Sequence, residues 1–71
     1  MTASRVPVSS SVFRSVGYDS ATQTLELEYV GGEVYQYHDV PTEVHSAMMA
    51  APSKGKFFHA CIKDKYRTER Q

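Results

Sequence analysis

The alternation of side chains in residues 24–29 is the feature that most constrains the fold of this chain. Large apolar or aromatic residues alternate there with polar ones: Leu25, Leu27 and Tyr29 against Thr24, Glu26 and Glu28. A period of two puts the two sets on opposite faces of a β-strand. The segment therefore predicts a strand with one buried face and one acidic, solvated face.

A glycine pair, Gly31-Gly32, follows this strand. A two-residue hairpin turn of the primed type needs positive φ, which glycine adopts at little steric cost. We therefore expect the chain to fold back into a strand over residues 33–38. In this strand Tyr35 and Tyr37 share one face, and we expect that face to meet the helices.

An earlier strand is predicted from Val12 onward, before a polar turn at residues 19–23. Two sets of residues alternate in it: Val12, Val16 and Tyr18 against Phe13, Ser15 and Gly17, with Arg14 on the apolar side. Residues 1–8 are predicted to be a flexible leader and residues 69–71 a frayed tail. Residues 9–68 then form a single domain.

Two helices are predicted after the third strand. Pro41 suits the first position of a helix, and Pro52 ends it. Ser53 is a suitable N-cap for a second helix, in which i, i+4 spacing gives two apolar rows: Phe57 with Cys61, and Phe58 with Ile62 and Tyr66. On this interpretation Cys61 is a small buried hydrophobe.

The order of these elements predicts an α+β fold. It consists of a three-stranded antiparallel β-meander followed by two α-helices packed on one face, in the order β-β-β-α-α. At 71 residues the chain is one small domain with a modest core.

The single cysteine excludes an internal disulfide and favours a reducing compartment, so we expect a cytoplasmic location. No apolar stretch is long enough to span a membrane.

Charge is distributed unevenly along the chain. The formal net charge is zero, but residues 1–50 carry −4 and residues 51–71 carry +4. A basic segment interleaved with aromatic residues is typical of nucleic-acid-binding surfaces, and equally of the wet side of an ordinary helix. The candidate nucleic-acid-binding residues are Lys54, Lys56, Lys63, Lys65 and Arg67.

Catalytic and metal-binding patterns are not found. The histidines and Cys61 lack the spacing of a zinc site, and no general base lies within helical reach of Cys61. Glu26 and Glu28 share a strand face, which is ordinary for a solvated sheet surface. We therefore expect a non-catalytic protein with no metal and no small-molecule cofactor.

Several segments together resemble the KTSC domain, a family named for its occurrence at the C-terminus of some lysyl-tRNA synthetases and found also as free-standing proteins. The segments that carry the resemblance are Ser15-Val16-Gly17-Tyr18-Asp19, Tyr35-Gln36-Tyr37, Val40-Pro41 and Ser53-Lys54-Gly55-Lys56-Phe57-Phe58, followed by Ile62 and Tyr66. The resemblance covers residues 8–68 and implies the fold, the size and a bacterial or phage setting. RNA binding has been suggested for the family.

The motif residues are interpreted as structural: Tyr35, Tyr37, Pro41, Ser53, Gly55, Phe57 and Phe58. For the two tyrosines a core role is favoured over exposed base stacking. Two functions stay open. One is binding of RNA, with tRNA as an example, through the basic second helix. The other is a protein–protein interaction, with a charge-complementary partner or with a second copy.

Overall fold

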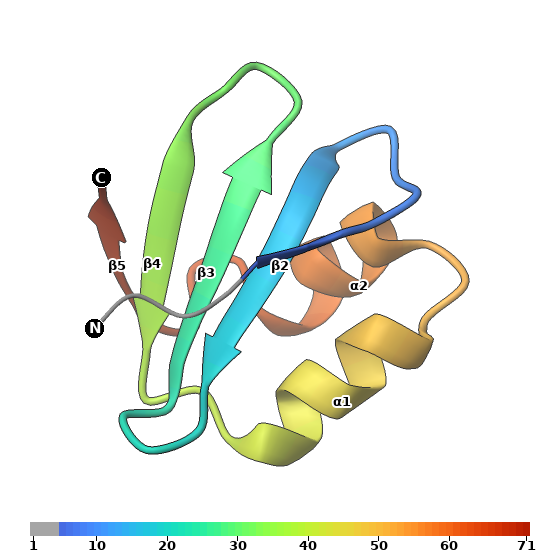
Figure 1. Cartoon of the computed structure of the whole chain (residues 1–71). Helices are drawn as coiled ribbons and strands as arrows, with labels where there is room; N and C mark the ends of the chain where they lie inside the picture. The colour runs from blue at the N-terminus through green and yellow to red at the C-terminus, as the bar shows by residue number, and fades with distance from the viewer. Residues whose placement is uncertain (1–4) are drawn as a thin grey trace.

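The computed structural model describes residues 5–71, which form one antiparallel sheet and two helices (Figure 1). The strands follow the chain in order across the sheet, β1-β2-β3-β4-β5, and both helices pack on one side of it. The elements are β1 Arg5–Pro7, β2 Phe13–Asp19, β3 Thr24–Tyr29, β4 Val34–His38, α1 Thr42–Ala50, α2 Lys54–Cys61 and β5 Arg67–Arg70.

The α+β class is confirmed, but the prediction of three strands is two strands short. β1 pairs with β2, and β5 pairs with β4, so the two additional strands form the edges of the sheet. Every residue of both strands is exposed. Because an edge strand with no buried face shows no hydrophobic period, neither segment carried a strand signal. Pro7 is compatible with β1 because that strand is at an edge.

Strand β2 departs from strict alternation at its start. Phe13 and Val16 were predicted to face opposite sides, yet both are fully buried in the core. The pairing register with β3 shifts between Phe13 and Ser15, which leaves Arg14 as an extra, exposed residue. This β-bulge turns Phe13 to the same side as Val16.

The hairpin between β3 and β4 forms where the glycine pair predicts it, with a longer loop. The Tyr29 amide donates to the Glu33 carbonyl at 2.8 Å, and the Gly32 amide donates to the Tyr29 carbonyl at 2.9 Å. Only Gly32 of the pair has a positive φ, 100°. The turn is therefore a three-residue loop closed by a left-handed glycine, and not the predicted two-residue turn.

Both helices start where the sequence predicts, α1 after Pro41 and α2 after Ser53. Pro41 precedes α1, and the Ser53 hydroxyl accepts a hydrogen bond from the Lys56 amide at 3.3 Å. Helix α2 ends at Cys61, earlier than the apolar row through Tyr66 indicated. The amides of Ile62 and Lys63 both donate to the Phe58 carbonyl there, and the chain then turns into β5.

The core lies between the sheet and the helices. Its buried members are Phe13, Val16, Leu25, Leu27, Tyr37, Val40, Met48, Phe58 and Ile62. The prediction that Tyr37 faces the helices is confirmed, and Tyr35 packs against the core while half-buried. The prediction that Cys61 is buried is wrong, because α2 presents that side chain to solvent. No helix within residues 5–71 is long and apolar enough to cross a membrane.

Candidate functional site

An aromatic pocket of about 370 Å³ lies between the helix-facing side of the sheet and α2. Cavities of this size fall within the range that holds small molecules or single groups of larger ligands. We define the aromatic pocket by its lining residues, which are Val12, Tyr29, Tyr35, Tyr37, Phe58, His59, Lys63, Asp64 and Thr68.

The walls of the aromatic pocket are rings set nearly perpendicular to one another. The Tyr29 ring meets the Tyr35 ring edge to face, with centroids 5.4 Å apart, and the Tyr37 ring meets the Phe58 ring at 5.5 Å in the same way. This arrangement is the one that aromatic quadrupoles prefer. A planar guest could lie flat on one ring while its edge meets another.

Two hydroxyl groups meet at this aromatic wall. The oxygens of Tyr29 and Tyr37 are 2.9 Å apart, within hydrogen-bond distance. Burial raises the pKa of both hydroxyls above their ordinary value. Both groups therefore stay protonated at neutral pH, and because one proton suffices for the mutual bond, the other hydroxyl proton is free to be donated.

The rim of the aromatic pocket is polar and exposed. His59 comes from α2, Lys63 and Asp64 from the turn after it, and Thr68 from β5. Asp64 has a φ of 62°, in the left-handed region that aspartate tolerates better than most residues. A cation, a carboxylate and a hydroxyl thus surround an aromatic cavity.

A second hollow, of about 540 Å³, adjoins the aromatic pocket. Val12 and His59 line both cavities, and the second one continues past Lys56 to Ser53 at the N-terminus of α2. Lys56 and His59 are three residues apart on α2, and Lys63 follows in the turn after the helix. We refer to the two cavities together, with these three residues, as the α2 groove.

The five basic residues predicted from the sequence do not form one patch. Lys56 and Lys63 line the α2 groove, one in each cavity. Lys54 is half-buried, with its Nζ 3.4 Å from the Ala51 carbonyl oxygen. Lys65 is exposed in the turn before β5 and lines none of the cavities described.

Arg67 lies elsewhere because its segment is a strand. It pairs with His38 in the sheet register, two residues from the pair of Gln36 with Glu69. Since Gln36 contacts Glu26 on the sheet face away from the helices, Arg67 belongs to that face as well. The basic residues predicted to act together are therefore divided between a helix, a turn and an edge strand.

The motif residues have mainly structural positions. Ser53 caps α2, Pro41 precedes α1, and Gly55 is buried against Val12. Phe57 packs against the core while partly exposed, and Phe58 is buried. Tyr35 and Tyr37 belong to both the core and the candidate site, since they contact the core and also line the aromatic pocket.

Sequence reasoning did not identify several residues of the α2 groove as site residues: Val12, Tyr29, His59, Asp64 and Thr68. The i, i+3, i+7 spacing of Lys56, His59 and Lys63 was a signal that could have grouped these three. Thr68 carried no such signal, because it reaches the pocket only through the pairing of β5 with Tyr37 on β4.

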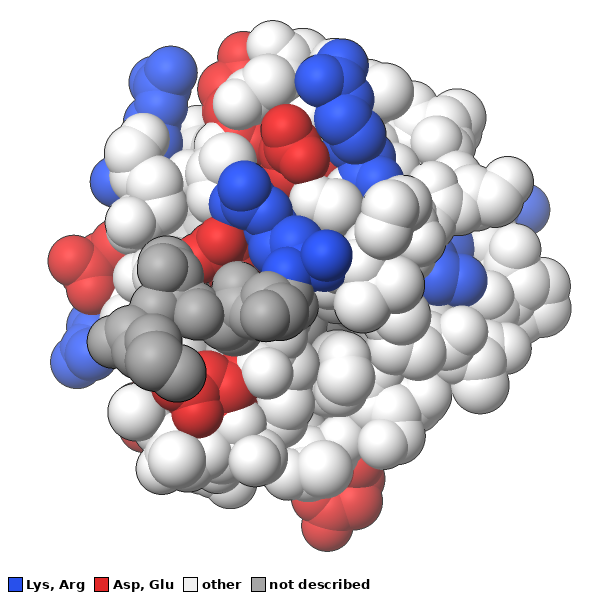
Figure 2. All heavy atoms as spheres, viewed as in Figure 1, with Lys and Arg blue, Asp and Glu red and all other residues white. Residues whose placement is uncertain are grey.

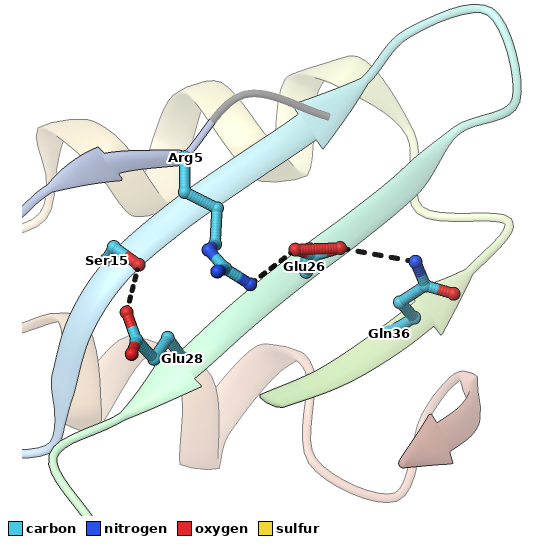
Figure 3. Close-up of polar contacts among 5 residues, drawn as sticks. All are labelled: Arg5, Ser15, Glu26, Glu28 and Gln36. Atoms are coloured by element: carbon cyan, nitrogen blue, oxygen red, sulfur yellow. Dashed lines mark hydrogen bonds and ion pairs between the residues drawn. The ribbon is translucent and has the colours of Figure 1, made fainter. Parts of the chain in front are cut away.

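The opposite sheet face holds a polar network in place of the predicted solvated acidic surface (Figure 3). Glu26 is only 3% exposed. Its carboxylate forms an ion pair with Arg5 Nη1 at 2.6 Å and accepts a hydrogen bond from the Gln36 amide at 3.2 Å. Glu28 accepts from the Ser15 hydroxyl at 2.8 Å. The prediction for Glu26 fails because β1 brings Arg5 over it.

Charges of both signs are interleaved over the strands on the face seen in Figure 2. A hollow of about 580 Å³ on the polar sheet face is lined by Arg5, Glu26 and Glu28 among others, but these side chains already bind one another or Ser15. Within residues 5–71, no three His, Cys, Asp or Glu side chains are grouped so that they could hold a metal ion. The α2 groove is therefore the stronger candidate for a binding site.

Comparison with known proteins places this arrangement in a family. The family model of the KTSC domain matches residues 9–66. A KTSC domain protein of Yersinia pestis, known from its crystal structure, superposes with a TM-score of 0.93 at 41% identity over 99% of both chains. A protein of Tsukamurella paurometabola is 43% identical over 61 residues, which are 86% of this chain and 91% of the relative.

A second kind of relative is much longer than this chain. A lysine–tRNA ligase of Trichormus variabilis is 44% identical over 59 residues, which are 83% of this chain and 10% of the ligase. The domain therefore occurs both as most of a small protein and as a minor part of a tRNA-handling enzyme.

Proposed function

The chain belongs to the KTSC domain family, and we propose that it is a non-catalytic binding module that engages RNA along the α2 groove. The observation that carries this proposal is the placement of Lys56 and Lys63 in the two adjoining cavities of the groove, with the aromatic pocket at one end. Proteins that bind single-stranded nucleic acid commonly combine cations for the backbone with aromatic rings for the bases.

The positions of the two lysines suit a nucleic-acid backbone. Lys56 lines one cavity from α2, and Lys63 lines the adjoining cavity from the turn after the helix, so the groove offers one cation in each cavity. Both side chains are exposed, so each can follow a phosphate without loss of an internal ion pair.

The relatives support the same ligand class. The lysine–tRNA ligase of Trichormus variabilis carries a related segment in a protein whose name states that it acts on tRNA. This association supports an RNA ligand for the domain, although the related segment is only 10% of that protein.

The test compares two double variants of equal charge. Lys56→Gln/Lys63→Gln removes the groove cations, and Lys54→Gln/Lys65→Gln removes two cations that flank the groove. Binding of a labelled unstructured RNA is followed by fluorescence anisotropy at about 50 and 200 mM salt. With two phosphate contacts to a single strand, wild-type affinity should fall by about sevenfold between these salts.

We expect the groove variant to lose this salt dependence, with a decrease of about 1.4 in the slope of log affinity against log salt. The flanking variant should keep most of it. Circular dichroism verifies that both variants are folded. Equal losses in the two variants would show that net charge alone determines binding, and would refute the groove as the site.

A second candidate function is a protein interaction at the outer edge of β5. This strand ends the sheet, and all four of its residues are exposed. An exposed edge can pair with a strand of a partner or of a second copy, although charged residues such as Arg67, Glu69 and Arg70 disfavour unspecific pairing. Sedimentation at several protein concentrations and two salt concentrations tests for self-association of this kind.

A further inference from the structure

The rim of the aromatic pocket carries an acidic residue, Asp64, which binding of the RNA phosphate backbone alone would not require. Asp64 places a carboxylate on a rim that otherwise offers a cation and a hydroxyl, Lys63 and Thr68. A carboxylate repels phosphate, so its presence beside Lys63 is unfavourable for a surface that contacts only the backbone. It is favourable for a ligand that presents hydrogen-bond donors to this point.

Asp64 is available to such a ligand. Across residues 5–71 its side chain takes part in none of the ion pairs or hydrogen bonds that the structure shows. It lies, with a φ of 62°, in the turn that leads from α2 to β5.

The shape of the cavity selects a flat group. Tyr29 and Tyr35, both half-buried, provide ring surfaces at a steep angle of 75° to one another. An unstacked base can cover one ring with its face, as in other RNA-binding domains. Its hydrogen-bonding edge then points toward the polar rim.

We propose that the aromatic pocket holds one unstacked nucleobase bearing an exocyclic amino group, which donates a hydrogen bond to the Asp64 carboxylate while Lys63 contacts the adjoining phosphate. The inference rests on the proposed RNA-binding function and adds base selectivity to it. Uracil is disfavoured, because it has a carbonyl oxygen where cytosine has an amino group, and two acceptors would then face each other.

The decisive comparison is between oligocytidylate and oligouridylate of about eight nucleotides, a length within the usual range for small single-strand-binding domains. Both ligands have a pyrimidine of the same size and the same backbone charge. We expect the wild-type protein to bind the cytidine oligomer at least about fivefold more tightly, by fluorescence anisotropy at low salt.

Asp64→Asn tests the role of the carboxylate, since an amide can both donate and accept. Asparagine also tolerates positive φ, so the turn should keep its conformation. Asp39→Asn is the matched control: Asp39 is exposed, has a φ of 61° and does not line the pocket. We expect the cytidine preference to disappear in Asp64→Asn and to persist in Asp39→Asn.

The outcomes separate this inference from the function on which it rests. Equal binding of the two oligomers by the wild-type protein would overturn the base selectivity and leave RNA binding intact. Loss of the preference in both variants would also overturn it, since a general charge effect would then explain the result. Failure of the wild-type protein to bind either oligomer would overturn the proposed function and the inference together.

Discussion

Gly55 lies so close to Val12 that a Cβ atom added to the glycine would be 2.8 Å from the Val12 Cγ2 atom. Real Cβ atoms essentially never approach a neighbour to this distance, so any side chain at this position would require Val12 or the first turn of α2 to shift. The contact also positions Val12, which lines both cavities of the α2 groove.

Gly55→Ala should therefore destabilise the protein, although alanine favours helices more than glycine does. The gain in helix propensity is at most about 1 kcal/mol, and overpacking at a close contact costs about 1–3 kcal/mol. We expect a net loss of up to about 2 kcal/mol in the free energy of unfolding, measured with urea. The double variant Val12→Ala/Gly55→Ala should lose less than the sum of its single variants. If Gly55→Ala were more stable than the wild-type protein, the Val12 side chain would have to move away from position 55 at little energetic cost.

Arg5 and Glu26 provide a second prediction, which tests whether β1 belongs to the stable domain. Arg5→Met leaves a buried carboxylate with Gln36 as its remaining partner in the network. Breaking a buried pair costs up to about 3–5 kcal/mol, and because the Arg5 side chain is 34% exposed we expect about 1–3 kcal/mol.

Arg14→Met is the control for this measurement. The Arg14 side chain is 60% exposed and its Nη1 is 3.9 Å from Glu28 Oε2, so its removal should cost less than about 1 kcal/mol. Urea unfolding of the three proteins gives the comparison. Similar stabilities for Arg5→Met and the wild-type protein would mean that the Arg5–Glu26 ion pair does not stabilise the attachment of β1 to the sheet.

Local patterns were sufficient to predict the central part of the fold. The alternation in residues 24–29, the glycine pair and the cap at Ser53 are signals contained within a few residues, and the corresponding elements form at these places. The edge strands were missed because β1 and β5 bury no side chains and gain their order from backbone pairing with β2 and β4. Pairing of that kind leaves no period in the sequence.

The candidate site was less predictable than the fold. Lys56 and Lys63 were identified from charge, but their grouping with Tyr29 and Thr68 depends on tertiary contacts between α2, β3 and β5. Glu26 was misjudged for the same reason, since its burial depends on Arg5, 21 residues away in the chain. The positive charge of residues 51–71 is likewise not gathered on one helix, because Arg67 and Arg70 lie on β5 at the edge of the sheet.

The hydroxyl pair of Tyr29 and Tyr37 predicts an alkaline loss of stability. Burial raises the pKa of both groups in the folded protein above the ordinary value of 10.0. Above about pH 10 the unfolded chain therefore releases protons that the folded protein retains, and stability falls as pH rises. Ultraviolet absorbance of tyrosinate should show that the part of the signal due to Tyr29 and Tyr37 appears only above pH 10.

Tyr37→Phe checks this assignment. It should lose about 1 kcal/mol at neutral pH, the usual net contribution of such a hydrogen bond, and show a weaker decline of stability above pH 10. Tyr35→Phe is the control, because the Tyr35 hydroxyl takes part in none of the hydrogen bonds found in residues 5–71. An alkaline decline of stability that is the same in Tyr37→Phe and in the wild-type protein would contradict the assignment to the hydroxyl pair.

His45 predicts a loss of stability on the acid side. Its ring stacks on the Tyr18 ring, with centroids 4.5 Å apart and an interplanar angle of 8°. Burial lowers the pKa of His45 below its ordinary value of 6.5. Below about pH 6.5 the unfolded chain therefore binds protons that the folded protein does not, and stability decreases until the pH falls below the pKa of the folded state.

His45→Phe should remove this component, because phenylalanine keeps a ring on Tyr18 and has no proton to bind. We expect its free energy of unfolding to fall less than that of the wild-type protein between about pH 7.5 and pH 5.5, the interval in which an ordinary histidine titrates. His59→Phe serves as the control, since it makes the same chemical change at an exposed position of α2 and shows the effect of a histidine-to-phenylalanine substitution as such. Parallel slopes for His45→Phe and the wild-type protein would instead assign the acid sensitivity to groups other than His45.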